Sequence, residues 1–147
     1  MHDCRDQATH ERILDAAERL FAEHGFAATS LRRITGAAAV NLAAVNYHFG
    51  DKESLYAEVL RRRLRPINAA RLARLEQAVA AAGDAPPALE EVIDILLRPV
   101  FEVHRDPARG GPHIVRIIAR TLTEPLPFMS ALLREELHAV LARFAQI

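Results

Sequence analysis

The chain has 147 residues, of which 50% are hydrophobic, and its 19 basic and 19 acidic side chains leave no formal net charge. This length fits one domain, or one small domain with part of a second, and the apolar content is sufficient for a buried core. The balanced charge excludes a global field that would draw the chain to nucleic acid, so any contact with DNA must depend on local charges. The only cysteine, Cys4, excludes an internal disulfide and is typical of a reducing compartment. Because no apolar run reaches transmembrane length and the first ten residues are polar, we expect a cytoplasmic protein.

The first predicted helix covers residues 9–24 and ends at Gly25. Alternating, strand-like patterns are absent and the six glycines cluster at turns, so we expect an all-α fold. One face of this first helix is apolar, and its members are Ile13, Leu14, Ala17, Leu20 and Phe21.

Two short helices and a tight turn are predicted next. Ser30 can cap the first of them, and Asn41 can cap the second, which runs from about residue 42 to 48. Val45 and Phe49 lie four residues apart as inward anchors of the second helix. Two helices joined by a three-residue turn form the helix-turn-helix, whose second helix enters the major groove of DNA.

The remaining chain is also predicted to be helical. Asp51 can cap a long helix over 51–82, in which Pro66 is expected to cause a kink. A helix over about 87–104 carries an apolar stripe wide enough to predict burial against several partners. A short helix and a final helix follow, and the apolar pattern is still running at Ile147. The members of the wide stripe are Leu89, Val92, Ile93, Leu96, Leu97, Val100 and Phe101.

Residues 40–55, which read V-N-L-A-A-V-N-Y-H-F-G-D-K-E-S-L, resemble the DNA-binding domain of the TetR family of bacterial transcriptional repressors. The resemblance begins in the first helix, in the strings R-I-L-D-A-A and L-F-A-E-H-G-F, and covers about residues 9–60. It implies an N-terminal three-helix DNA-binding domain over 1–50, completed by the start of a fourth helix from residue 51. Residues 51–147 would then form a helical ligand-binding and dimerisation domain that is incomplete at its C-terminus, because family members usually continue with about two more helices.

The resemblance assigns the groove-facing positions of the second helix to Leu42, Ala43, Ala44 and Asn46. Asn suits a bidentate contact with adenine, and Ala and Leu can touch thymine methyl groups. Arg32 matches a position that contacts guanine in some members of the family, with Arg33 as an alternative. Both arginines could instead be solvated surface charges.

The family positions that grip phosphate fall on Ser30, Tyr47, His48 and Lys52, which is the only lysine of the chain. A hydroxyl, a phenol, an imidazole and a lysine at a helix N-terminus all suit that role. Between residues 29 and 52 three cationic side chains face one anionic side chain, so the local charge is +2, of the right sign for DNA. Alternatively, Tyr47 and His48 cover the edge of the hairpin and Lys52 is an ordinary residue of a first helical turn.

One departure from the family pattern lies in the turn. Ala39 stands where the family usually has Gly, and alanine in a left-handed conformation costs on the order of 1 kcal/mol. We therefore expect a slightly strained or reshaped turn.

The resemblance also implies a homodimer that leaves a palindromic operator when a small molecule binds. Residues 40–50 together with Pro66, Ile67 and Asn68 look like those of a fatty-acid-responsive, PsrA-like subgroup, so an acyl chain or acyl-CoA is the expected ligand. The candidate ligand-binding residues are Val100, Phe101, His104 and Ile117.

An enzyme and a helical interaction module are the two alternatives to a DNA-binding regulator. No phosphate loop, H-E-x-x-H pair or nucleophile setting is present, so we expect no enzyme, no catalytic residue, no metal site and no cofactor. A helical protein-interaction module without DNA binding is the stronger alternative, because each predicted helix also makes sense as packing.

Overall fold

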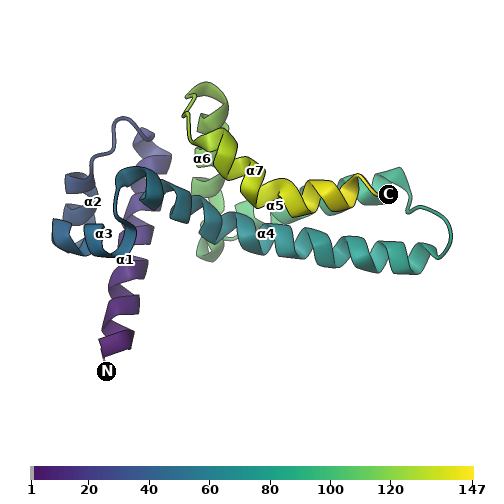
Figure 1. Ribbon diagram of the computed structural model, residues 1–147, viewed down its shortest axis with the longest axis horizontal. Coiled ribbons are helices and arrows are strands. Elements are labelled where there is room, and N and C mark those ends of the chain that lie inside the picture. Colours follow the sequence, from purple (N-terminus) through teal and green to yellow (C-terminus); the bar gives the residue numbers. More distant parts are fainter. Residues whose placement is uncertain (1) are drawn as a thin grey trace. The chain divides into compact units, whose positions relative to one another are not determined.

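The computed structural model describes the backbone of residues 2–147, and the side chains of residues 1–4, Arg109 and Leu122 lie outside the described part. The side chain of Cys4, the single cysteine that was expected to form no internal disulfide, therefore lies outside the described residues. Every regular element in the described part is helical, so the predicted all-α fold is confirmed (Figure 1). The helices are α1 (His2–His24), α2 (Leu31–Ala38), α3 (Leu42–Phe49), α4 (Lys52–Ala82), α5 (Leu89–His104), the 3₁₀ helix η1 (Pro107–Arg109), α6 (Gly111–Thr123) and α7 (Met129–Phe144).

The chain folds into two compact units. The first unit comprises Met1–Arg61 with His113–Pro125, and the second comprises Arg62–Pro112 with Leu126–Ile147. Helix α4 therefore contributes its first ten residues to one unit and the rest to the other. Most of α6 groups with the N-terminal helices. The sequence instead predicts that residues 51–147 form one domain, and that domain boundary stays a prediction.

The core of the first unit forms where α1 meets the start of α4. The Phe21 ring, which is completely buried, meets the Tyr56 ring edge-on at a centroid distance of 4.8 Å. The Phe26 ring contacts the same tyrosine at 5.3 Å. Helix α1 begins at His2 rather than at the predicted residue 9, because no Gly or Pro interrupts residues 2–8 and the Thr9 hydroxyl bonds to the Arg5 carbonyl within the helix.

Helix α6 closes this unit against the end of α1. Ile114 and Ile117 are buried at its inner face. The Arg120 guanidinium donates from Nε to the Ala22 carbonyl at 3.2 Å and from Nη2 to the Glu23 carbonyl at 3.0 Å. These carbonyls belong to the last turn of α1, where the helix itself supplies no partner. Arg120 thereby satisfies the exposed end of α1 from a helix about a hundred residues away along the chain.

The second unit packs α4, α5 and α7 around a smaller core. Leu75, Ala78 and Ile95 form a buried cluster against which Phe144 packs. Polar side chains tie the helices together: Asn68 donates to the Glu136 carbonyl at 2.8 Å, and Arg71 donates to the Leu96 carbonyl at 2.8 Å. Burial lowers the pKa of Arg71 below its ordinary value.

The predicted burial of the wide stripe on α5 is wrong. Ile95, Pro99 and Val103 form the buried face of α5. Apolar residues lie on more than one side of α5, so their spacing could not show which side meets α4. Four members of the stripe stand in solvent at i, i+4 spacing, with exposed fractions of 69% for Leu89, 47% for Ile93, 47% for Leu97 and 58% for Phe101. Among the described residues, none of the helices has both the length and the apolar character needed to span a membrane.

Candidate nucleic-acid interface

One side-chain cap fixes the start of each short helix, as the sequence predicts. The Ser30 hydroxyl accepts from the Arg33 backbone N–H at 3.2 Å and begins α2. The Asn41 side chain accepts from the Ala44 backbone N–H at 2.8 Å and begins α3. Each cap satisfies a backbone donor that the helix cannot pair internally.

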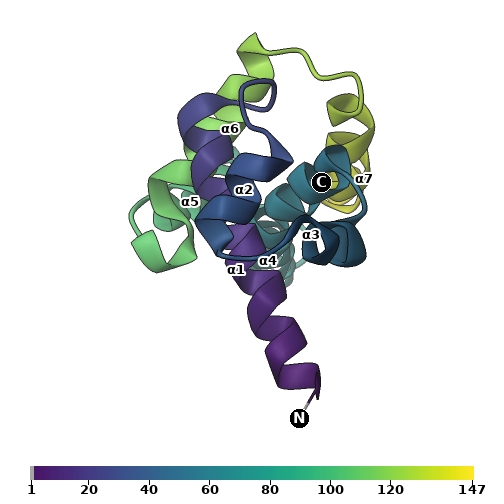
Figure 2. The ribbon, with the colours of Figure 1, turned by 90° about the vertical axis from the view of Figure 1, so that its left-hand side faces the viewer.

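Helix α3 has one buried side and one exposed side. Val45 and Phe49 are buried and hold the helix against the first unit. Leu42, Ala43 and Asn46 are exposed, and we call these three residues of α3 the reading face. The helix that carries them is labelled α3 in Figure 2. Ala44, the remaining predicted groove-facing residue, is only half exposed. The structure thus places three of the four predicted base-contacting side chains together on one accessible surface.

The turn between α2 and α3 contains the left-handed residue that was expected. Ala39 has φ 53° and ψ 49°, and it is the only non-glycine residue with positive φ in the described part of the chain. Its backbone N–H donates to the Gly36 carbonyl at 3.4 Å, and the Val40 N–H donates to the Thr35 carbonyl at 3.1 Å. These bonds close the end of α2 and direct the chain into α3. The side chain at position 39 costs on the order of 1 kcal/mol that glycine would not.

The two arginines of α2 differ in their surroundings. Arg33 donates to the Ala28 carbonyl at 3.2 Å, and its second amino group lies 3.0 Å from Nε2 of His24. The guanidinium of Arg32 is exposed and makes no hydrogen bond to any residue that the structure describes. The guanidinium donors of Arg32 are therefore unused within the described residues, whereas Arg33 holds the segment before α2.

Lys52 points toward its own unit. Its Nζ donates to the Phe26 carbonyl at 2.8 Å and lies 4.2 Å from the centre of the Phe26 ring. The cation therefore gains both a hydrogen bond and the attraction of an aromatic face. Next to it, the Asp51 carboxylate accepts from the Ser54 backbone N–H at 2.7 Å, and this bond is the main reason why the pKa of Asp51 is lowered. The start of α4 is thus fixed to the segment between α1 and α2.

Tyr47 and His48 face different surroundings although they are neighbours. Tyr47 is 78% exposed. The His48 side chain is only 9% exposed, with Nε2 lying 3.4 Å from Oδ1 of Asp6 and the ring 5.5 Å from that of His10. Sequence reasoning missed Asp6 as a partner because the first helix was expected to begin only at residue 9, and the uninterrupted run without Gly or Pro before Thr9 is the signal that could have found it. His10 lies inside the predicted helix and was missed because spacing along the chain does not show which helices meet.

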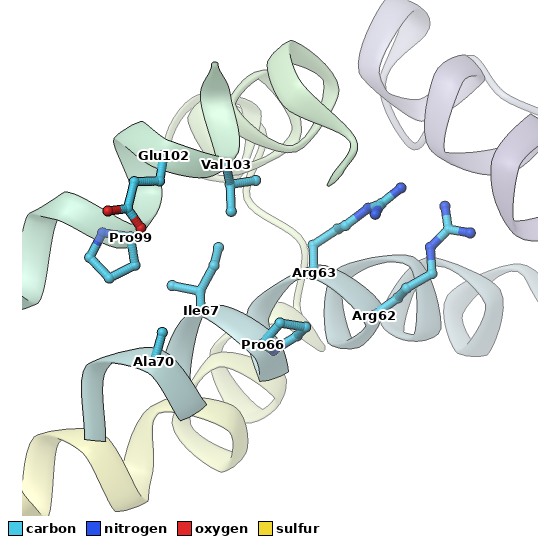
Figure 3. Close-up of a pocket in the computed structure, with 8 residues that line it drawn as sticks. All are labelled: Arg62, Arg63, Pro66, Ile67, Ala70, Pro99, Glu102 and Val103. Atoms are coloured by element: carbon cyan, nitrogen blue, oxygen red, sulfur yellow. The ribbon is translucent and has the colours of Figure 1, made fainter. Parts of the chain in front are cut away.

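A cavity of about 340 Å³ lies in the second unit between α4 and α5 (Figure 3). None of the predicted ligand-binding residues lines it: Ile117 is buried in the first unit, Val100 is half-buried, and Phe101 and His104 are exposed. Prolines within the two helices are the sequence signal for this cavity. Its lining consists of Arg62, Arg63, Pro66, Ile67, Ala70, Pro99, Glu102 and Val103.

The chain is similar to known regulatory proteins. AcrR of Shigella flexneri, an HTH-type transcriptional regulator, is 45% identical over 53 residues, which are 36% of this chain and 25% of that protein. AcnR of Corynebacterium glutamicum, an HTH-type transcriptional repressor, is 41% identical over 58 residues, or 38% of this chain and 31% of that protein. These similarities thus span about a quarter to a third of the length of the two relatives. A crystal structure described as a gamma-butyrolactone receptor, or ArpA-like protein, has the same fold with a TM-score of 0.59 at 24% identity, covering 96% of this chain and 69% of that one.

Both parts of the chain match models of one family. Residues 13–59, which include the caps, the turn and the reading face, match the bacterial regulatory proteins of the tetR family. Residues 94–147 match the tetracyclin repressor-like C-terminal domain. With the helix-turn-helix geometry of α2 and α3, these two matches show that the chain belongs to the TetR family of bacterial regulatory proteins.

Proposed function

We propose that this protein is a DNA-binding transcriptional repressor that reads its operator through α3. The observation that carries the proposal is the reading face: Leu42, Ala43 and Asn46 stand exposed on a helix whose other side is anchored by Val45 and Phe49. Such a helix can enter the major groove without disturbing its own packing. The names of the relatives, a regulator and a repressor, support the same function.

Base recognition would rest on few contacts. Asn46 offers the bidentate pattern that suits adenine, and Leu42 and Ala43 offer apolar contact to thymine methyl groups. Arg32 adds a fork of donors suited to the O6 and N7 atoms of guanine. A reading surface with so few polar groups makes Arg32 the main determinant of specificity.

Phosphate contacts would hold α3 in register. We assign them to Ser30, Tyr47, His48 and Lys52, of which Tyr47 is the most exposed. The inward bonds of Lys52 and His48 support a second contribution, in which these two side chains hold the helix ends in place before DNA arrives. Phosphate contacts give affinity that does not depend on sequence.

The second unit would bind the effector. We propose a small, largely apolar molecule such as an acyl chain or acyl-CoA, bound in the cavity between α4 and α5. Release from DNA requires the effector to bind the DNA-incompetent arrangement more tightly than the competent one. We further propose that the protein acts in the cytoplasm as a homodimer on a palindromic site. Light scattering that finds a stable monomer at micromolar concentration would contradict the dimer.

The experiment is to select bound sequences from a random pool of duplex DNA and then measure affinities for the selected site and for single-base variants. Arg32→Ala should relax specificity at one position of each half-site at a cost of about 1–3 kcal/mol. Lys52→Ala should weaken binding to all sequences about equally and reduce the salt dependence. Arg116→Ala, which removes an exposed arginine of α6, is the control and should change neither.

The outcome separates the repressor from an interaction module. If the selection recovers no enriched, salt-sensitive sequence, the protein does not read DNA in this form. If Arg32→Ala and Lys52→Ala behave alike, the division between base contact and phosphate contact is wrong. Thermal unfolding of Lys52→Ala is measured in parallel, because the loss of the Phe26 contact can destabilise the first unit.

A further inference from the structure

Helix α5 has an apolar side that the chain itself leaves uncovered. Its inner side packs within the second unit, where Val103 points toward Ile67 of α4 (Figure 3). On the outer side Ile93, Leu97 and Phe101 are 47%, 47% and 58% exposed, and successive members lie four residues apart. Residues at this spacing share one side of a helix. Contiguous exposed apolar surface is typical of a site that meets another molecule.

Two polar side chains continue this outer side at the ends of the helix. Glu90 lies seven residues before Leu97, His104 lies seven residues after it, and both are exposed. Seven residues make about two helical turns, so both lie on the same side of α5 as Leu97. Neither side chain makes a hydrogen bond or an ion pair to any residue that the structure describes. We call the following five residues the outer face of α5: Glu90, Ile93, Leu97, Phe101 and His104.

Other charged side chains of α5 are already paired within the chain. Arg98 donates to the two carboxylate oxygens of Asp94 at 2.7 and 2.8 Å. Arg74 of α4 donates to both carboxylate oxygens of Glu102 at 2.9 Å. These four side chains therefore have little to offer a partner. The charges of α5 that remain available are acidic in its first turn and basic in its last turn.

The outer face is complementary to itself in one orientation. When two copies of α5 pack antiparallel about a twofold axis at Leu97, residues equally far before and after Leu97 come to the same level. Ile93 of each copy then meets Phe101 of the other, and Glu90 meets His104. An imidazole N–H can donate to a carboxylate whether or not the ring is protonated. A parallel pair would place the two Glu90 carboxylates side by side, and like charges repel.

We propose that the outer face of α5 forms the interface between two copies of this chain, packed antiparallel about Leu97, with Glu90 of each copy bonded to His104 of the other. This inference rests on the homodimer proposed above and names the surface that forms it. The outer face lies wholly within the second unit. None of its residues belongs to the reading face or lines the cavity between α4 and α5, so it can be altered without touching either.

A substitution at the twofold axis tests the surface. Leu97→Asp brings two carboxylates together at the centre of the interface, so it should raise the dissociation constant of the dimer at least about thirtyfold. Leu141→Asp is the matched control, because Leu141 is 57% exposed on α7 of the same unit, and it should change this constant less than about twofold. Sedimentation equilibrium of the full chain without DNA measures both. Unfolding is measured where the unaltered chain is monomeric, so that lost folding is distinguished from lost association.

Charge exchange tests the orientation. Glu90→Arg should weaken association about fivefold at low salt, because each new cation meets an imidazole, and His104→Glu should do the same, because each new carboxylate meets Glu90. The two changes combined in one chain should restore association to within about twofold, since each pair forms again with its signs exchanged. Raising the salt concentration should reduce the differences among these chains.

The outcomes separate the interface from the proposed function. A chain that is monomeric at micromolar concentration overturns both the interface and the homodimer, whereas a dimer that Leu97→Asp leaves intact overturns the interface alone. Equal weakening by Leu97→Asp and Leu141→Asp also contradicts the surface, and failure of the double exchange to restore association contradicts the antiparallel pairing. If Leu97→Asp does not fold, the exchanges at the exposed ends still decide the question. Selection of DNA sequences is independent of these results, because it reports on the reading face.

Discussion

The two units of this protein use their apolar side chains in opposite ways. Of the twelve largest completely buried side chains that the structure describes, only Leu75 and Val140 belong to the second unit. Among the described residues, eight large apolar side chains are exposed, and six of them belong to the second unit: Leu89, Ile93, Leu97, Phe101, Leu141 and Ile147. The first unit therefore holds a complete core, whereas the second leaves apolar surface and a cavity available.

This difference fits the tasks proposed for the two units. A reading helix must keep its shape to within a fraction of an ångström, and a close-packed interior resists such displacement. A unit that accepts a small molecule must have space that its own side chains do not fill. In the first unit the only large apolar residues left exposed among those described are Leu42 and Tyr47, which both lie on α3.

The largest expected effect compares two phenylalanines. Phe21 is completely buried in the first unit and Phe101 is 58% exposed in the second. Phe21→Ala should lower the free energy of unfolding by about 3–5 kcal/mol, because it removes apolar contacts and leaves a void, whereas Phe101→Ala should cost less than about 1 kcal/mol. Urea unfolding followed by circular dichroism measures both. Similar losses in the two variants would mean that the packing of the units does not differ as described.

The next effect depends on alkaline pH and on Tyr56 in the core of the first unit. Burial, with the nearby Glu124 carboxylate, raises the pKa of Tyr56 to about 12, while Arg120 acts in the opposite direction. The unfolded chain then loses this proton near pH 10, before the folded protein does, so the stabilising contribution is complete below pH 10 and is lost as the pH rises toward 12. Relative to Tyr56→Phe, the unaltered protein should lose roughly 2 kcal/mol over this window.

The titration itself can be followed by tyrosinate absorbance. The chain has two tyrosines, so Tyr47→Phe leaves Tyr56 as the only source of the signal. Tyr56 should ionise only near pH 12, or together with unfolding. Ionisation at pH 10 in a folded protein would show that water reaches the phenol and that the core of the first unit is packed less tightly than described.

Local signals predicted the hairpin well. Ser30 and Asn41 cap α2 and α3 as expected, and Ala39 adopts the left-handed conformation. Each of these features depends on a few neighbouring residues, whose backbone preferences act whatever the rest of the chain does. The all-α fold could be predicted for the same reason.

Features that depend on distant partners could not be predicted. Hydrophobic spacing located α5 but assigned the burial to its wrong side, because the orientation is set by the helices that α5 meets. The pairing of Lys52 with the Phe26 carbonyl and of His48 with Asp6 joins residues 26 and 42 positions apart. The cavity likewise requires α4 and α5 side by side, a relation that sequence spacing does not contain.

Removal of the Arg120 side chain should have an intermediate effect on the stability of the first unit. Arg120→Ala removes both hydrogen bonds to the last turn of α1 and should lower the free energy of unfolding by about 1–2 kcal/mol, since two carbonyl groups lose a charged donor. Arg116 lies on the same helix and its side chain is exposed, so Arg116→Ala should change the free energy of unfolding by less than about 0.5 kcal/mol. Hydrogen exchange should show faster opening at the end of α1 only in the first variant. If both variants behave alike, α6 is not a working part of this unit.

The smallest effect concerns the one strained position in the otherwise well-packed first unit. Ala39 is exposed and left-handed, so Ala39→Gly relieves a backbone strain and leaves no void. It should raise the free energy of unfolding by up to about 1 kcal/mol, because glycine adopts φ 53° without a steric penalty. Ala37→Gly is the matched control, since Ala37 is also exposed but lies inside α2, where glycine should cost about 0.5–1 kcal/mol. Thermal unfolding measures both variants. If Ala39→Gly stabilises the protein and Ala37→Gly destabilises it, the strain lies in the turn itself. Two losses of equal size would instead show that the turn relaxes away from the left-handed conformation in solution, and that the reading face is held less firmly than the packing of its unit indicates.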